Sequence, residues 1–178
     1  SQKRLSQLEA LTTINQTMLS MTEIEAFYAT LQEQVGRVIG NYSFAVALYD
    51  DKTNSINIPY LYEDGKVDTI DPFPLGEGLT SILIRTRRPL MLVEDTERQA
   101  AALGAKIHGK PAKSWMGVAL LICEDAIGAI IVQDTEHERQ FDEKHLAFLT
   151  EAAKQMAGVI NNMRMLDQSR QTALQLQT

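Results

Sequence analysis

The chain has 178 residues, of which 44% are apolar, and its 23 acidic and 17 basic side chains give a formal net charge of −6. This length suits one domain of about 100–150 residues with extensions, and the apolar share is sufficient for a core. The acidic balance argues against sequence-independent nucleic-acid binding, which needs a surplus of basic side chains. No apolar run approaches the roughly 20 residues of a membrane span.

Two helices are predicted at the N-terminal end. Over residues 3–21, apolar side chains recur at spacings of three and four, which is the helical period. A second stripe of the same period runs over residues 22–39 and ends at Gly40 and Asn41, which are suitable helix terminators.

Strand patterns follow. Residues 42–50 are almost all apolar, which is typical of a central strand buried on both faces. Residues 56–62 form a second strand, in which Pro59 favours an edge position or a bulge. An Asp-Gly turn leads to a short strand at 67–70, and the prolines of 71–74 predict irregular structure there.

The second half of the chain repeats this mixture of short helices and strands. We expect a helix over 79–86, a strand over 90–93, and a partial helix with a loop over 96–113. Two antiparallel strands (114–123 and 127–134) then precede a long helix, 143–172, which Asp142 can cap. Because hairpins dominate, the sheet is expected to be antiparallel, with helices packed on it.

The stretch "LGEGLTS" (75–81) raises the possibility of a phosphate-binding turn, since glycine-rich turns that open helices often hold phosphates. A dinucleotide-binding fingerprint needs a third glycine where Leu83 stands, and a P-loop needs lysine where Leu79 stands. Gly76 and Gly78 are therefore interpreted as a sharp entry to a short helix.

The ordered set of motifs resembles the GAF domain, a small-molecule sensory module of signalling proteins. The resemblance covers roughly residues 23–162. It is carried by "LGEGLTSILIRTRRPLMLVEDT" (75–96), "SWMGVALLICEDAIGAIIVQD" (114–134) and "RQFDEKHLAFLTEAAKQMAGVINN" (139–162). Ser81 and Ala119 depart from it, because the family often has Gly and Pro at these two places.

The resemblance implies an α/β (α+β) fold with a central antiparallel sheet of about six strands. Terminal helices would cover one face, and a short helix with loops would roof a pocket on the other. It divides the chain into a signalling or dimerisation helix (1–22), the GAF domain (23–162) and a helical extension (163–178) toward an output module. It further implies a cytoplasmic protein of the histidine kinase or cyclic-dinucleotide enzyme class.

The candidate ligand-binding residues are those expected around the implied pocket: Tyr49, Tyr60, Leu79, Ile82, Asp95, His108, Ser114 and Trp115. Asp95 ends a strand, and two interpretations stay open: it hydrogen-bonds a ligand, or it caps the segment that starts at Thr96. Trp115 either packs in the core or lines the cavity.

The cofactor stays unassigned. Bilin-binding members of the family usually carry their attachment cysteine within the stretch that corresponds to 96–113, where this chain has none. The single cysteine, Cys123, is expected to be a buried strand residue. Haem ligation by His108 is disfavoured against an exposed loop histidine. The cyclic-nucleotide motif is absent, because Phe141 is followed directly by Asp142-Glu143 instead of after three residues.

Catalysis and metal binding are not expected. No Ser-His-Asp order, nucleophile elbow or clustered metal ligands can be identified. One cysteine cannot form the internal disulfide that methionine sulfoxide-reducing GAF domains use.

The function predicted from these patterns is ligand sensing by a homodimer, with pocket occupancy relayed through a helical bundle. Leu8, Leu11, Met156, Met163 and Leu166 are the expected dimer contacts. The expected partners are a second copy, an unidentified small molecule and an output domain, with no nucleic acid and no membrane. The alternative is a ligand-free domain that only dimerises or spaces its neighbours.

Overall fold

The computed structural model describes residues 23–176. Its elements are α2 (Ile24–Val38), β1 (Ser43–Asp50), β2 (Ser55–Glu63), β3 (Lys66–Pro74), α3 (Leu79–Thr86), β4 (Leu90–Leu92), α4 (Thr96–Ala102), β5 (Ser114–Ile122), β6 (Asp125–Asp134) and α5 (Glu143–Leu176). The expected first helix over 3–21, with Leu8 and Leu11, lies outside the described residues.

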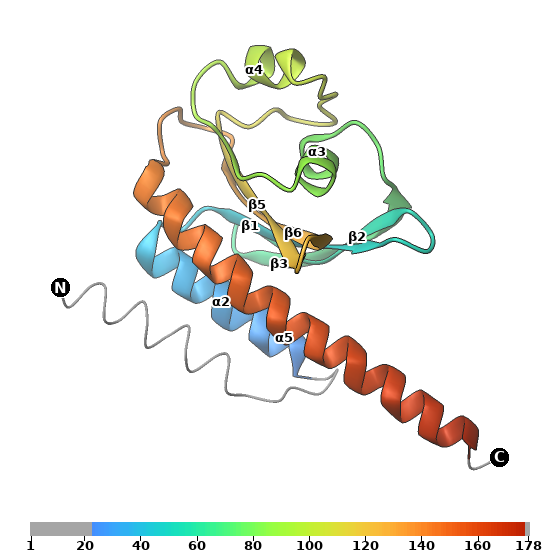
Figure 1. Cartoon of the computed structure of the whole chain (residues 1–178). Coiled ribbons are helices and arrows are strands. Elements are labelled where there is room, and N and C mark those ends of the chain that lie inside the picture. The colour runs from blue at the N-terminus through green and yellow to red at the C-terminus, as the bar shows by residue number, and fades with distance from the viewer. Residues whose placement is uncertain (1–22, 177–178) are drawn as a thin grey trace.

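The strands form one six-stranded sheet in the order β3-β2-β1-β6-β5-β4, with every neighbouring pair antiparallel. Helices α2 and α5 lie against one face of the sheet, and α3 and α4 lie over the other (Figure 1). The predicted α+β fold, with its terminal helices together on one face, is confirmed.

The core between the sheet and the terminal helices comes from two helical stripes and one face of the strands. Phe27, Leu31 and Val35 of α2 and Leu149 of α5 are at most 6% exposed and pack in this core. Strand residues at alternate positions complete it, because successive side chains of a strand point to opposite faces. Each strand therefore has a second set of side chains for the opposite face.

A close backbone contact at Gly128 explains a glycine in the middle of β6. A Cβ atom at this position would lie 2.1 Å from the carbonyl oxygen of Ala47 in β1. The ladder between β5 and β6 shifts register just beside it, between Leu120 and Leu121. Only glycine permits this approach of the two strands.

The prediction that residues 71–74 are irregular is wrong, because β3 continues through both prolines to Pro74. Strand β3 lies at the edge of the sheet, where a residue without an N–H group is tolerated. Pro59 stands in β2 between two strands, and it falls where the register with each neighbour shifts. Of the two alternatives predicted for Pro59, the bulge is confirmed and the edge position is wrong.

The prediction that Cys123 is buried is also wrong. The thiol is exposed, and Cys123 has a φ of 56° in the turn between β5 and β6. The strands pair as far as Ile122 and Asp125, so Cys123 and Glu124 make the turn. The apolar run before the turn gave no sign that the hairpin closes so early.

Helix α5 spans 34 residues, which corresponds to about 51 Å, and it extends past the sheet (Figure 1). Two of the expected dimer contacts are buried within the chain: Met156 is 1% exposed and Met163 is 9% exposed. Met156 belongs to the core under the sheet and is not available to a second copy. Leu166 is half-buried, and beyond it Leu174 and Leu176 are exposed.

Candidate ligand pocket

A cavity of about 500 Å³ lies on the face of the sheet away from α2 and α5. Strands β1, β2, β3, β5 and β6 supply its floor, while the turn before α3 and the segment after α4 supply its roof. Its lining is Ser43, Phe44, Ala45, Ile58, Leu61, Glu63, Ile70, Phe73, Pro74, Gly76, Glu77, Gly78, Leu79, Thr80, Ser81, Thr96, Lys106, Ile107, His108, Lys110, Ala112, Trp115, Ile131 and Gln133.

Gln133 of β6 marks the polar part of the floor. It pairs with Ser43 of β1 on one side and with Trp115 of β5 on the other. Residues directly opposite each other in antiparallel strands share a face, so these three side chains stand in one row under the cavity. Two residues further along β1, Ala45 is small and leaves room above the sheet.

The apolar part of the floor depends on the bulge at Pro59. Ile58 and Leu61 are three positions apart in β2, and in a regular strand they would point to opposite faces. The register shift between them turns both toward the cavity, while Tyr60 points to the other side. Phe73 of β3, whose partner in β2 is Ile56, completes this apolar part of the floor, which we call the apolar wall.

The roof is held together by contacts between the glycine turn and the segment after α4. The Lys106 backbone N–H donates to the Glu77 carbonyl oxygen at 2.9 Å, and their side chains form an ion pair at 2.8 Å. The Ser81 hydroxyl accepts a hydrogen bond from the Gly76 N–H at 3.0 Å. Hydrogen bonding to Lys106 lowers the pKa of the Glu77 carboxyl, and the same bond raises the pKa of Lys106.

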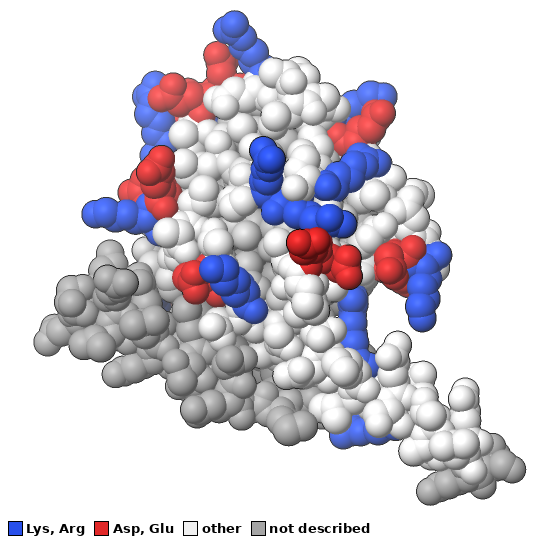
Figure 2. Space-filling model, viewed as in Figure 1, with Lys and Arg blue, Asp and Glu red and all other residues white. Residues whose placement is uncertain are grey.

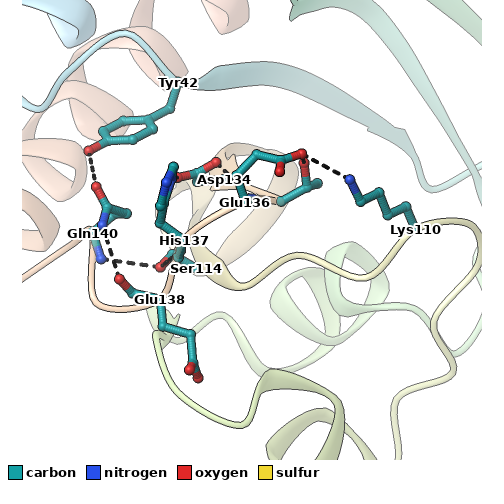
Figure 3. A network of polar contacts seen from close by, with 9 residues as sticks. Tyr42, Lys110, Ser114, Asp134, Glu136, His137, Glu138 and Gln140 are labelled. Atoms are coloured by element: carbon teal, nitrogen blue, oxygen red, sulfur yellow. Dashed lines mark hydrogen bonds and ion pairs between the residues drawn. The ribbon is translucent and has the colours of Figure 1, made fainter.

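A network of polar contacts joins Lys110 in the pocket roof to the loop that precedes α5 (Figure 3). Lys110, which lines the cavity, pairs with Glu136 at 2.9 Å. The buried Ser114 hydroxyl donates to the His137 carbonyl oxygen at 2.8 Å and accepts from the Gln140 N–H at 3.2 Å. The Gln140 side chain in turn accepts from the Tyr42 hydroxyl at 2.9 Å.

Three of the eight candidate ligand-binding residues, Leu79, His108 and Trp115, line the cavity. The other five lie outside its lining. Tyr60 is buried among the helices' core residues, and the Tyr49 hydroxyl donates to Asn54 in the turn after β1. Ile82 is half-buried on α3.

Asp95 and Ser114 have structural contacts in place of pocket contacts. Asp95 occupies the N-cap position of α4 with a φ of 48°, but its side chain makes no capping hydrogen bond. Its backbone N–H donates to Glu138 Oε2 at 3.0 Å. Ser114 belongs to the network described above, so its hydroxyl is already hydrogen-bonded twice.

The sequence reasoning missed most of the floor, including Ser43, Ala45, Ile58 and Gln133. A usable signal existed for Gln133, because it is a polar residue at the end of a long apolar strand. No sequence pattern indicated which face of the sheet Ile58 and Leu61 occupy, because their orientation depends on the bulge at Pro59.

Three further properties of the described residues concern metal ions, membranes and surface charge. Residues 23–176 contain no group of three or more His, Cys, Asp or Glu side chains that could hold a metal ion. No described helix is both long enough and apolar enough to cross a membrane. On the face shown in Figure 2, acidic and basic side chains are interspersed and do not gather in one patch.

The sheet order, the helices on both faces and the roofed cavity define a small α+β domain. Residues 21–161 match the family model described as the GAF domain, and the chain belongs to this family.

Several solved structures share the fold. The GAF domain of an Acinetobacter phosphoenolpyruvate-protein phosphotransferase has a TM-score of 0.73 at 18% identity, covering 93% of this chain and 96% of that one. The free methionine-R-sulfoxide reductase of Neisseria meningitidis, solved with its substrate, has a TM-score of 0.68 at 16% identity, with coverage of 90% and 89%. The GAF domain of a Bacillus halodurans two-component sensor histidine kinase has a TM-score of 0.60 at 16% identity, with coverage of 85% and 99%.

Proposed function

We propose that this GAF domain is a non-catalytic regulatory module that binds a small molecule in the cavity between the sheet and α3. The observation that carries the proposal is the cavity itself. Its volume of about 500 Å³ lies within the roughly 300–1,000 Å³ of small-molecule sites, and it combines an apolar wall with a few polar groups. In the described residues, the side chains of Ser43, Thr80 and Gln133 make no hydrogen bond, so they can meet a ligand.

The structural effect of ligand binding would be transmitted to the rest of the protein through β5 and β6. Trp115 and Ile131 line the cavity, whereas their neighbours Met116 and Val132 pack in the core shared with α5. A shift of these strands therefore alters the surface on which α5 rests. Because packed cores switch between discrete arrangements, a small shift at the pocket can move a long helix.

The setting proposed for the domain is a cytoplasmic signalling protein with an output module, of the histidine kinase or cyclic-dinucleotide enzyme class. Similar folds occur in a sensor histidine kinase and in a methyl-accepting chemotaxis protein, which supports this class. A homodimer would use the part of α5 beyond the sheet, where Met165, Leu174 and Leu176 are at least 60% exposed.

The alternative is a ligand-free module that dimerises or spaces its neighbours. The exposed apolar residues of α5 favour dimerisation in either case, so they do not separate the two functions. The discriminating property is whether the cavity accepts a molecule.

A thermal-shift screen of a small-molecule library separates these functions. The binding proposal expects compounds that raise the melting temperature of the native chain but not of Ala45→Phe, which fills the floor. Ser43→Phe is a second filling variant at a half-buried position, in case Ala45→Phe folds poorly. Absorption spectra of the purified protein would reveal haem or bilin. If each hit shifts the native and filled chains alike, the binding proposal is wrong.

A further inference from the structure

The charged groups of the pocket are all at its entrance. Glu63, Glu77, Lys106, His108 and Lys110 are the ionisable side chains of the lining, and every one of them is exposed. Lys106 pairs with Glu77 at 2.8 Å, and Lys110 pairs with Glu136 at 2.9 Å. Both lysine side chains are therefore already paired with a carboxylate and remain hydrated.

The inner part of the pocket offers hydrogen bonds without charge. Ser43, Thr80 and Gln133 are half-buried and carry hydroxyl or amide groups that are free for a ligand. The Gln133 amide supplies one acceptor and two donor hydrogens. Two other polar groups of the lining are already engaged: Ser81 binds the Gly76 N–H, and the Thr96 hydroxyl donates to the Ala112 carbonyl oxygen.

This arrangement disfavours an ionic ligand for an energetic reason. An ion that enters the pocket loses much of its hydration, and no buried side chain of opposite charge meets it there. A neutral group with both a donor and an acceptor loses less hydration, and Gln133 and Thr80 can replace what it loses. The start of α3, whose first turn has no side-chain cap, further disfavours a cation and weakly attracts an anion. This attraction is smaller than the hydration free energy that a carboxylate loses on burial, so the pocket still disfavours an anion.

Resting on the ligand-binding function proposed above, we infer that the pocket selects an uncharged molecule with an amide-like polar head and an apolar body. The head would lie over the row formed by Ser43, Gln133 and Trp115. The body would lie against Ile58, Leu61 and Phe73.

The experiment uses three probes with the same phenyl body: phenylacetamide, phenylacetate and 2-phenylethylammonium. Trp115 is the only tryptophan of the chain and lines the cavity, so its fluorescence reports binding of probes that do not absorb where tryptophan is excited. We expect the dissociation constant of the amide to be lower than that of either ion by about tenfold or more.

Variants of Gln133 test the head-group contact. Gln133→Leu keeps the approximate volume and is expected to remove most of the preference for the amide. Gln133→Glu adds a negative charge and is expected to favour 2-phenylethylammonium. Gln171→Leu and Gln171→Glu are matched controls on the exposed part of α5, and they should keep the native order of the three probes.

The outcomes separate this inference from the proposed function. If phenylacetate or 2-phenylethylammonium binds as tightly as the amide, the inference is wrong while ligand binding stands. If no probe changes Trp115 fluorescence up to the solubility limit of the amide, the inference is also contradicted. The thermal-shift screen then decides whether the pocket binds any molecule at all.

Discussion

Gly117 of β5 lies directly beneath Leu83 of α3. A Cβ atom at Gly117 would come within 2.6 Å of Leu83 Cδ1 and within 2.7 Å of Trp115 Cη2. Leu83 is fully buried, and Trp115 lines the cavity. The missing side chain at Gly117 therefore determines how closely α3 approaches the sheet beside the pocket.

Gly117→Ala should lower the free energy of unfolding by about 1–3 kcal/mol, because the added methyl group overpacks a buried contact. Denaturant unfolding measures this change. Gly158→Ala in α5 is the matched control, since no atom beyond its two neighbours and the adjacent helix backbone lies within 4 Å of its Cβ position. That control should be neutral or should stabilise by up to about 1 kcal/mol. Equal stability of the two variants would contradict the close contact.

Ser114→Ala should destabilise the domain by about 1–3 kcal/mol, because it removes a fully buried hydroxyl and leaves the His137 carbonyl and Gln140 N–H without their partner. The free energy of unfolding from denaturant titration provides the measurement. Ser169→Ala, at an exposed position of α5, should change stability little. A Ser114→Ala chain as stable as this control would show that the hydroxyl does not hold the loop before α5.

Asp142 caps α5: its Oδ1 accepts from the His145 N–H at 3.0 Å, and this bond lowers the pKa of the Asp142 carboxyl. A lowered pKa means that the unfolded chain binds the proton more tightly than the folded chain. The stabilisation is therefore complete near neutral pH and is lost as the pH falls below about 4.

Asp142→Ala should be less stable than the native chain at pH 7, and the difference should shrink in acid. Melting temperatures across this pH range test the sign. Asp142→Asn keeps a capping oxygen without a titrating group, so it should lie between the two at pH 7. A difference that grows as the pH falls would contradict the cap.

Tyr28 should make the domain sensitive to alkali. Burial raises the pKa of its phenol to about 12, and only 2% of the residue is exposed. Because the folded pKa is above the ordinary one, the folded chain holds this proton more tightly. The stabilisation is complete below about pH 10 and declines as the pH rises toward 12.

Tyr28→Phe keeps the ring packing and removes the titrating group, so its stability should fall less steeply above pH 10. Denaturant unfolding at successive pH values provides the comparison. Tyr49→Phe is a control at a half-buried tyrosine of β1, whereas Tyr28 lies on α2. Identical alkaline profiles for the native and Tyr28→Phe chains would show that this phenol does not contribute.

The sequence was sufficient for the order and type of most elements. Local period identified α2, α3 and α5, because each buries one stripe. Two apolar runs joined by a short turn identified the β5–β6 hairpin. Local patterns failed where tertiary position overrides propensity: Pro72 and Pro74 are accommodated because β3 is an edge strand. Edge position depends on which strands pair, and a local pattern does not contain that information.

The candidate pocket was predicted on the correct face but with a partial lining. Leu79, His108 and Trp115 come from the motifs that carried the family resemblance. Ser43 was missed because β1 was interpreted as buried on both faces, although its small residues leave space on one. The sequence left open which face of the sheet Tyr60 occupies, and the bulge at Pro59 turns it toward α2.

The central claim is that the cavity over Gln133 and Trp115 holds a small molecule. Native mass spectrometry tests it most directly, after the chain is incubated with the low-molecular-weight fraction of a bacterial extract. The account predicts a discrete added mass on the native chain that is absent from folded Ala45→Phe and Ser43→Phe chains. The same spectrum from all three chains, with or without added mass, would contradict binding in this cavity.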